Sequence, residues 1–252
     1  MSLIDSPTET PNPTASSLLD DIPPLTTQIL QDEDDQIAAL KLVADSIAQQ
    51  RQFAAKAVIL HPLTIVAWIG LLAILAQFLL KTSKDIGLLF TTSAGATMAC
   101  LVGVRALTSG YLALAEGLTW DFVRNDEGEE DLILGSRFGD ELIGALVLRL
   151  EKGGGGGKKK SGKKGKGGNG VVRAWTVRNR YRGKGVGTEL LEEAVRVTRD
   201  KLGRDAGVGF AAEHANSKMV LPDLFNLGFR KRETQAGRML EGVVAGMEKR
   251  KR

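Results

Sequence analysis

The segment Arg182-Gly183-Lys184-Gly185-Val186-Gly187 places three glycines at alternate positions, directly between a predicted strand and a predicted helix. Glycine is needed where backbone N–H groups approach an anion closely, because a side chain would block that approach. The following helix directs its N-terminus, with unsatisfied N–H groups and the positive end of its dipole, at the same point. The spacing therefore predicts that a phosphate or pyrophosphate binds at residues 182–188.

Two other glycine-rich phosphate motifs do not fit this segment. A Walker A loop requires Gly-Lys followed by Ser or Thr, whereas Lys184 is followed by Gly185. A dinucleotide-binding GxGxxG motif opens an early βαβ unit, whereas this motif comes late, after several strands with an antiparallel pattern. The loop alone thus indicates a phosphorylated ligand without identifying it.

Together with its neighbours, the loop resembles the signature of the GNAT acetyltransferase superfamily. That family carries Arg/Gln-x-x-Gly-x-Gly/Ala between its fourth strand and third helix, and Arg182, Gly185 and Gly187 match this pattern. GNAT chains also often show an Asn after the fifth strand and a later Gly-Phe, the places held here by Asn216 and Gly228-Phe229.

The resemblance covers about residues 25–50 and 120–250. Within the superfamily, the chain is similar to the membrane-anchored branch. It implies that acetyl-CoA is the co-substrate and that backbone amides of the loop hold its pyrophosphate. The edge of the strand Trp175–Val177 would pair with the pantetheine arm. The cofactor-binding residues implied by the resemblance are Trp175, Val177, Arg182, Gly183, Lys184, Gly185, Val186, Gly187, Thr188 and Asn216.

The reaction implied by the resemblance is direct transfer of acetyl from the thioester to an amine, which needs a base and an acid or water. Glu213, at the end of the predicted fifth strand, is the first candidate base, and its neighbour His214 is the second. The family often supplies the acid from a Tyr at the position of Leu224, and neither Leu224 nor Phe225 has a hydroxyl. A non-catalytic GNAT-fold membrane protein, acting in assembly or trafficking, therefore stays open as the alternative.

Two long apolar stretches precede this region. Val58–Leu80 and Ile86–Val104 contain no charged residue in 23 and 19 positions. At about 1.5 Å per residue they extend roughly 34 and 28 Å, close to a hydrocarbon core of about 30 Å. The polar segment Lys81–Asp85 predicts a turn between them. We expect a transmembrane helical hairpin; two buried helices of a soluble core are the alternative, although such helices seldom run this long without a charge.

The rest of the chain alternates between the periodicities of strands and helices. Asp131–Phe138 and Glu141–Glu151 predict two strands joined at Gly139-Asp140. The other predicted elements are a strand at Leu25–Leu30, a helix from about Asp34 to Lys56, a strand at Val171–Val177, a helix at Val186–Leu202, a strand at Gly207–Glu213, a helix at Asn216–Asn226 and a closing strand pair at Gly228–Thr234 and Met239–Met247. This order predicts a mixed α/β fold, a GNAT-like sheet flanked by helices, with the hairpin inserted after the first helix.

We divide the chain into an N-terminal tail (1–24), the first strand and helix (25–56), the hairpin (57–118) and the remainder of the domain (119–252). The tail is rich in Pro, Ser and Thr, and we expect it to be disordered. A loop at 152–170 holds ten Gly and seven Lys, a composition that cannot build a core. Such a loop could bind nucleic acid or anionic lipid, but a solvated insertion is favoured. Without interleaved aromatic residues, nucleic acid is not an expected partner.

Composition and charge restrict the remaining possibilities. The only cysteine is Cys100, and the two histidines are far apart, so no metal site is expected. Residues 1–31 lack the cationic start and apolar run of a signal peptide. The expected partners are the lipid bilayer and an amine, either protein or small molecule. We expect an intracellular membrane, the endoplasmic reticulum, with a cytosolic catalytic domain, because more basic residues flank the outer ends of the spans (Arg51, Lys56, Arg105 and Arg124) than the turn (Lys81 and Lys84).

Overall fold

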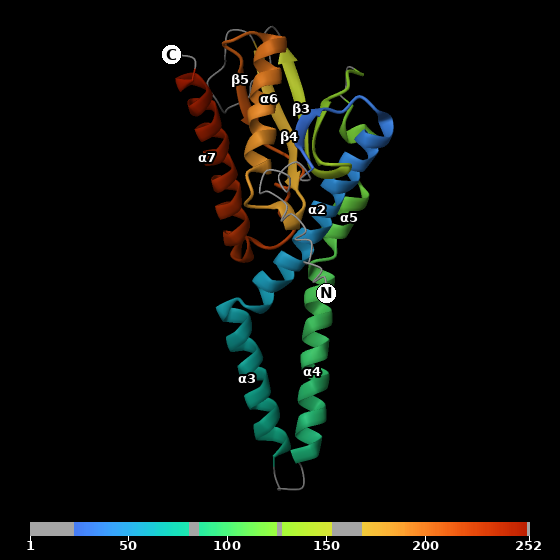
Figure 1. Cartoon of the computed structure of the whole chain (residues 1–252). Coiled ribbons are helices and arrows are strands. Elements are labelled where there is room, and N and C mark those ends of the chain that lie inside the picture. Colours follow the sequence, from blue (N-terminus) through green and yellow to red (C-terminus); the bar gives the residue numbers. More distant parts are fainter. Residues whose placement is uncertain (1–22, 81–85, 125–127, 153–167, 251–252) are drawn as a thin grey trace, which may run out of the picture.

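The computed structural model describes residues 23–80, 86–124, 128–152 and 168–250. Most of the predicted N-terminal tail, the predicted turn Lys81–Asp85 and residues 153–167 of the Gly/Lys-rich loop lie outside the described residues. The described residues form an α/β domain from which two long helices project in the same direction (Figure 1).

Five strands form one mixed sheet in the order β1-β2-β3-β4-β5. They are β1 (Leu25–Ile29), β2 (Leu132–Phe138), β3 (Glu141–Lys152), β4 (Gly168–Val177) and β5 (Gly207–Phe210). Neighbouring strands from β1 to β4 run antiparallel, whereas β5 runs parallel to β4. The predicted tight connection between β2 and β3 is present, and Gly139 adopts a φ of 59° in it.

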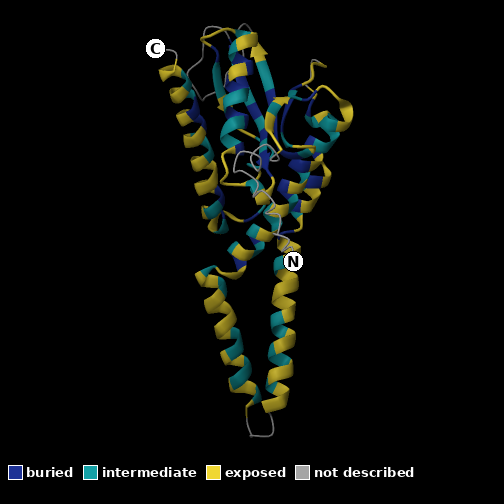
Figure 2. Ribbon diagram, in the orientation of Figure 1, coloured by how far each residue is buried: buried dark blue, intermediate teal, exposed yellow. Residues whose placement is uncertain are grey.

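Helices cover both faces of this sheet: α2 (Glu33–Ile59) and α5 (Gly110–Glu116) on one, and α6 (Val186–Leu202) and α7 (Leu227–Lys249) on the other. Successive residues of a strand point to opposite faces, so a strand between two layers is apolar throughout. In β3, Ala145 and Val147 pack toward α2, while Leu146 and Leu148 pack toward α6. Figure 2 shows the buried residues gathered in the sheet and on the helical faces that cover it. The predicted α/β fold is confirmed.

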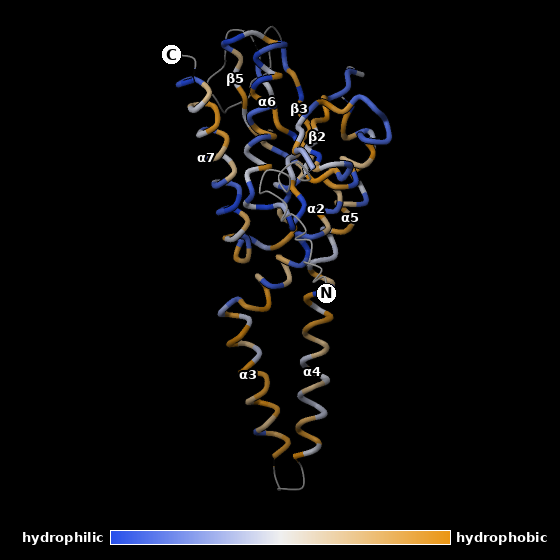
Figure 3. Tube along the Cα trace, in the orientation of Figure 1, coloured by the Kyte–Doolittle hydropathy of each residue, from blue (hydrophilic) through white to orange (hydrophobic). Residues whose placement is uncertain are grey.

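The two projecting helices are α3 (Pro62–Leu79) and α4 (Ile86–Leu107), and neither contains a buried residue. Trp68 Nε1 of α3 donates a hydrogen bond of 3.2 Å to Thr97 Oγ1 of α4. By length and composition both are apolar enough to cross a membrane, and the hydrophobic colour runs along both in Figure 3. They are therefore not core helices of the domain, which was the alternative considered from the sequence.

The boundary of the hairpin differs from the sequence prediction. Residues 110–116, which had been assigned to the hairpin, form α5, a separate helix on the domain side of α4. Tyr111 and Ala115 of α5 are buried, and Ala115 belongs to the core shared with α2 and the sheet. The apolar run that continues past α4 therefore belongs to the α/β domain.

The C-terminal region also corrects the prediction. The residues predicted as a closing strand pair form one continuous helix, α7, because its buried residues Phe229, Leu240 and Val243 share one helical face. The predicted helix over residues 216–226 is absent apart from the short 3-10 helix η4 (Asp223–Phe225), which Pro222 precedes. Proline disfavours the helical conformation in the residue before it, so no helix continues into η4 from residue 221.

Candidate active site

The glycine-rich loop lies between the end of β4 and the start of α6. A short 3-10 helix, η3 (Asn179–Tyr181), follows β4, and the chain then passes through Gly183 and Gly185 with φ values of 76° and 91°. These left-handed conformations strongly favour glycine. An added Cβ at either position would meet no heavy atom within 4 Å. The loop therefore exposes its backbone to open space, as a close anion contact requires.

Gly187 is required for a different reason. A Cβ on Gly187 would lie 2.8 Å from Cζ2 of Trp175, a separation that real Cβ atoms do not tolerate. The indole Nε1 of Trp175 donates a hydrogen bond of 3.2 Å to the carbonyl oxygen of Gly187. The Trp175 ring thus packs directly on the first turn of α6, and Gly187 allows that contact between strand and helix.

The first turn of α6 points into the loop. The amides of Thr188 and Glu189 both donate to the carbonyl oxygen of Gly185, at 2.9 and 3.1 Å. Val186 is only 3% exposed, so its side chain fixes the helix start in the core. An α-helix offers its first N–H groups no intrahelical acceptor, and those of Val186 and Gly187 are therefore available to an anion by helix geometry.

Basic side chains surround this helix end. Arg182 Nε donates a 2.8 Å hydrogen bond to the carbonyl oxygen of Val177, which closes the loop onto the end of β4. Burial of the guanidinium and, second, the nearby charge of Arg232 lower the pKa of Arg182. The pKa of a guanidinium is nevertheless so high that Arg182 stays charged at neutral pH. Lys184 Nζ lies 5.5 Å from the centroid of the Tyr181 ring. A bound anion would offset the repulsion among these cations.

Arg232 is a site residue that sequence reasoning missed. It lies in the first turns of α7, in a segment that had been predicted as a strand, and no motif marks it. Its guanidinium carbon lies 3.6 Å from the centroid of the Phe53 ring of α2. Only the fold brings α7 beside the loop.

The edge of β4 is open next to this loop. β5 pairs with β4 from Asn169 to Val172 only, so Trp175–Val177 has no strand on that side within the described ranges. Asn216 lies at this edge, with its Nδ2 3.5 Å from the carbonyl oxygen of Trp175, which is long for a hydrogen bond. The predicted cofactor-binding residues therefore lie together at one end of β4.

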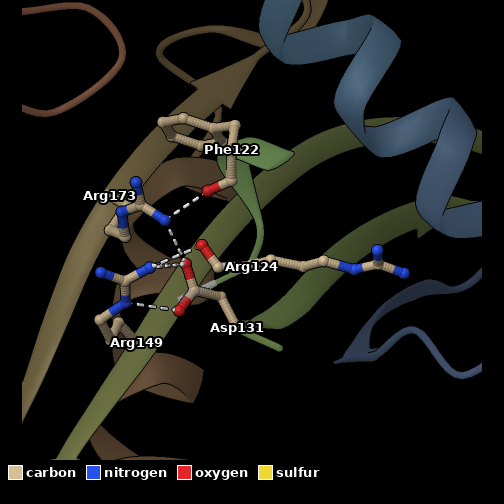
Figure 4. A network of polar contacts seen from close by, with 5 residues as sticks. All are labelled: Phe122, Arg124, Asp131, Arg149 and Arg173. Carbon is tan, nitrogen blue, oxygen red and sulfur yellow. Dashed lines mark hydrogen bonds and ion pairs between the residues drawn. The ribbon is translucent and has the colours of Figure 1, made fainter. Parts of the chain in front are cut away.

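A buried ion-pair network holds the neighbouring strands in place (Figure 4). The Asp131 carboxylate, with 3% of its side chain exposed, accepts hydrogen bonds from Arg149 Nε at 2.7 Å and Arg173 Nη1 at 2.6 Å. Arg173 also donates to the carbonyl oxygen of Phe122 in η2 (Trp120–Phe122). It is an extra residue of β4, which β3 skips in its pairing. The Arg173 carbonyl accepts from the amide of Ala215 at 2.8 Å, so the network holds the turn after β5 against β4.

This turn carries both candidate bases. β5 ends at Phe210, so Glu213 lies in an exposed turn and not at the end of the strand, as the sequence had indicated. His214 is partly buried, and its Nδ1 is buried without a hydrogen-bond partner in the described part of the chain. Burial lowers the pKa of His214, against smaller opposing effects of Glu233 and a backbone carbonyl. The neutral imidazole, which can accept a proton, is thus favoured at neutral pH.

His214 is connected to the loop through aromatic rings. Its ring centroid lies 5.7 Å from that of Phe210, which lies 5.9 Å from that of Trp175. Trp175 in turn contacts Gly187 at the start of α6. The imidazole and the anion-binding end of α6 therefore lie at the same end of the sheet.

Neither tyrosine is positioned as the missing acid. The Tyr181 hydroxyl donates to Glu141 at 2.9 Å, and this hydrogen bond raises the pKa of Tyr181. Tyr111 is fully buried, which raises its pKa, and its hydroxyl accepts from the amide of Val220 at 3.4 Å. Phe225, beside the position where the family often has Tyr, packs its ring against His61 at the start of α3.

Residues 106–219 match the acetyltransferase (GNAT) family. The match includes α5, strands β2 to β5, the glycine-rich loop and the turn with both candidate bases, and it ends before η4 and α7. It confirms the resemblance inferred from the loop motif: this part of the chain is similar to GNAT acetyltransferase domains. GNAT domains generally use acetyl-CoA, and the exposed glycine loop and its surrounding cations fit a pyrophosphate.

Two solved structures are also similar to part of the chain. Both are of an aminoglycoside acetyltransferase from an uncultured soil metagenomic sample, one in complex with trehalose and one with sisomicin. Each shares 13% sequence identity with this chain at a TM-score of 0.26. The similarity covers 40% of this chain and 55% of theirs, so the chain spans about half of their length. The comparison with curated proteins found no match.

Proposed function

We propose that this protein is a membrane-anchored N-acetyltransferase that transfers acetyl from acetyl-CoA to an amine. The observation that carries the proposal is the arrangement at the end of β4. A loop with left-handed Gly183 and Gly185 leads into the N-terminus of α6, beside an edge of β4 that β5 leaves open. The loop suits a pyrophosphate, and the open edge suits an extended pantetheine arm with amide groups of its own.

In this proposal, backbone amides from Arg182 to Thr188 hold the pyrophosphate. Arg182, Lys184 and Arg232 supply positive charge around it. Trp175 keeps the end of β4 and the start of α6 together through its bond to Gly187. Asn216 lies where the open edge begins and links β4 to α2 through Ser46, at 3.4 Å.

The chemistry needs a base more than an acid. The amine nitrogen forms a bond to the thioester carbonyl carbon, the carbon–sulfur bond breaks, and the sulfur leaves as a thiolate, which takes up the proton that the acylated nitrogen releases. A thiol with a pKa of about 8.5 leaves without a strong proton donor, so a missing Tyr does not prevent transfer. An alkyl ammonium with a pKa of about 10.4 must first lose a proton. We propose that His214 takes this proton, because burial favours its neutral imidazole and its ring lies at the same end of the sheet as the loop. Glu213, the first candidate from the sequence, stays a second prediction.

The anchoring part of the proposal rests on α3 and α4. Both helices lack charged residues over most of their length, and neither has a buried residue. We further propose that the membrane is that of the endoplasmic reticulum and that the α/β domain faces the cytosol, from the distribution of basic residues around the spans. No contact of the described residues argues for a particular acceptor amine.

The test separates binding from turnover. Full-length protein in detergent is titrated with acetyl-CoA by calorimetry, and thiol release is then followed with a panel of peptide and small-molecule amines. We expect binding, and thiol release that depends on one class of amine. Absence of binding by folded protein would refute the proposal.

A non-catalytic GNAT-fold protein that acts in assembly or trafficking is the second candidate. The observation that favours it is the hydrophobic pair Leu224 and Phe225 in η4, where the family often has a Tyr. The same titration decides between the two candidates. Acetyl-CoA binding with no acetylation of any amine, at any pH, would support this candidate.

A further inference from the structure

A groove opens between α2 and α4, where both helices pass from the α/β domain to the projecting hairpin. Its cavity volume is about 320 Å³. Its walls come from the last third of α2, the end of α4 and the start of α5. None of its lining residues belongs to the glycine-rich loop or to the turn with His214, and the proposed reaction does not use it.

The groove contains two cations, and its lining from there toward the hairpin is mainly apolar. Arg51 of α2 and Arg105 of α4 line its middle part, with Ala48, Thr108 and Leu112 beyond them on the side of the domain. Ile59 and Leu101 line it further along the same helices, on the side of the hairpin. At about 1.5 Å per residue, Arg51 precedes Ile59 by roughly 12 Å along α2. The groove therefore changes from charged to apolar in the direction in which a bilayer would change from headgroups to acyl chains.

The two guanidinium groups have no acidic partner of their own. In the described ranges, neither Arg51 nor Arg105 takes part in an ion pair. Asp45 of α2 and Glu116 of α5 are the nearest acids along these helices, and both lie further from the hairpin. Two cations that line one groove beside apolar residues favour a ligand that carries an anionic phosphate on an apolar body.

We propose that this groove binds an anionic phospholipid, with its phosphate between Arg51 and Arg105 and an acyl chain along Ile59 and Leu101. The apolar wall continues directly into the charge-free faces of α3 and α4, which favours a lipid over a free phosphate. This inference rests on the membrane anchoring proposed above. The bound lipid would hold α2 and α4 together at the junction and set the height of the active site above the bilayer.

The test uses full-length protein in mild detergent with equal amounts of phosphatidylserine and phosphatidylcholine. Native mass spectrometry reports which lipid the protein retains. We expect phosphatidylserine to be retained preferentially, and the variant with Arg51→Gln and Arg105→Gln to lose about tenfold of that preference, because both charge-assisted contacts are removed. The variant with Lys201→Gln and Arg204→Gln, which removes two exposed charges outside the groove, is the matched control and should retain the preference.

Two further measurements separate the possible failures. An environment-sensitive fluorophore on the natural Cys100, exposed on α4, reports whether the hairpin enters vesicles of the same lipids. A Cys100 probe that stays in water would refute the anchoring itself. A Cys100 probe in lipid with no preference for phosphatidylserine, or with an unchanged preference in the double variant, would overturn the lipid site alone. Displacement of the lipid by millimolar inorganic phosphate would also overturn it, in favour of a site for a free anion.

Discussion

At the scale of single residues, the three glycines of the loop meet different physical requirements. Gly185 adopts a φ of 91° with open space around it, so a side chain there would enter the region assigned to the pyrophosphate. We predict that Gly185→Glu lowers acetyl-CoA affinity by about tenfold or more, since each charge-assisted hydrogen bond contributes about 1.5–3 kcal/mol. Calorimetric titration measures this change.

The matched control is Gly203→Glu at the other end of α6. Gly203 also has a positive φ, 99°, and open space around it, and its ψ of 160° makes a side chain there at least as strained as at Gly185. This variant should bind acetyl-CoA as the parent does. Equal affinity of folded Gly185→Glu and Gly203→Glu would mean that the loop is only a turn.

Gly187 leads to a prediction of rescue. Gly187→Ala places a methyl group 2.8 Å from the Trp175 ring, which must move away from α6. We expect the affinity for acetyl-CoA to fall, and a second substitution, Trp175→Leu, to restore part of it by removing the clash. Residues in contact show such non-additive effects. Strictly additive losses in the double variant would contradict the assigned packing.

His214 gives a prediction about pH. Because burial lowers its pKa, the imidazole becomes protonated only below the usual value of about 6.5. Turnover at saturating amine should therefore rise with pH through a midpoint below about 6.5 and then stay level. His214→Gln should reduce turnover by about 100-fold and remove the rising limb, with acetyl-CoA affinity unchanged. If Glu213→Gln has these effects instead, Glu213 is the base.

The same shift has a consequence for stability. A depressed pKa means that the unfolded chain binds the proton more readily than the folded chain does. This contribution to stability is present above about pH 6.5 and is lost as the pH falls through the lower, folded-state pKa. Thermal unfolding of His214→Gln should accordingly depend less on pH in the acidic range than that of the parent.

At the scale of elements, α7 gives the clearest test of the C-terminal structure. Leu240 is 4% exposed and packs in the core with α6, whereas its neighbour Glu241 is exposed. We predict that Leu240→Ala destabilises the domain by about 2–5 kcal/mol, a fall in thermal midpoint of roughly 5–15 °C. Glu241→Ala should change the midpoint little. Similar effects of both variants would contradict a one-sided helix.

The sequence predicted most of the sheet because its signals there are local. The Gly139-Asp140 pair predicted the turn between β2 and β3. The glycine-rich motif predicted a cofactor site at the junction of β4 and α6. The C-terminal prediction was wrong because four glycines in α7 and the pair Val243-Val244 lower its helix propensity. The buried residues Phe229, Leu240 and Val243 nevertheless have helical spacing. The burial of Leu240 and Val243 against α6 outweighs the low helix propensity of the segment.

The details of the active site depend on contacts that no local pattern contains. β5 ends at Phe210, so Glu213 lies outside the strand in which it was predicted. The Nδ1 atom of His214 is buried by tertiary packing, which no local pattern indicates. Arg232 approaches Arg182 because α7 crosses to the loop from elsewhere in the chain. Such long-range contacts have no sequence spacing from which to predict them.

At the scale of the whole molecule, the loop lies at the end of the domain from which the hairpin projects. Asn179 Nδ2, in η3, donates to Gln49 Oε1 of α2 at 3.0 Å. Gln49 precedes the end of α2 at Ile59 by ten residues, or roughly 15 Å. A membrane around α3 and α4 would therefore lie close to the loop, which favours acceptors presented at a membrane surface.

Anchoring itself predicts behaviour during extraction. In the proposed anchoring, a hairpin with no buried residue and almost no charge would be held by hydrocarbon and not by charge. The full-length protein should therefore stay in the membrane pellet after washing with alkaline carbonate and dissolve only in detergent. Release of full-length protein into the alkaline supernatant would exclude integral anchoring.

The orientation follows from the same hairpin. If both helices span the bilayer as proposed, the chain returns to the side where it began, and α2 and all elements after α4 would lie on one side. The basic residues at the outer ends of the spans predict that this side is the cytosol. In intact microsomes, a cysteine introduced at the exposed Ala245 of α7, in a Cys100→Ala background, should react with an added membrane-impermeant maleimide. A cysteine at Ser83, in the predicted turn between the spans, should react only after detergent is added. The reverse pattern would place the α/β domain in the lumen, where cytosolic acetyl-CoA does not reach it.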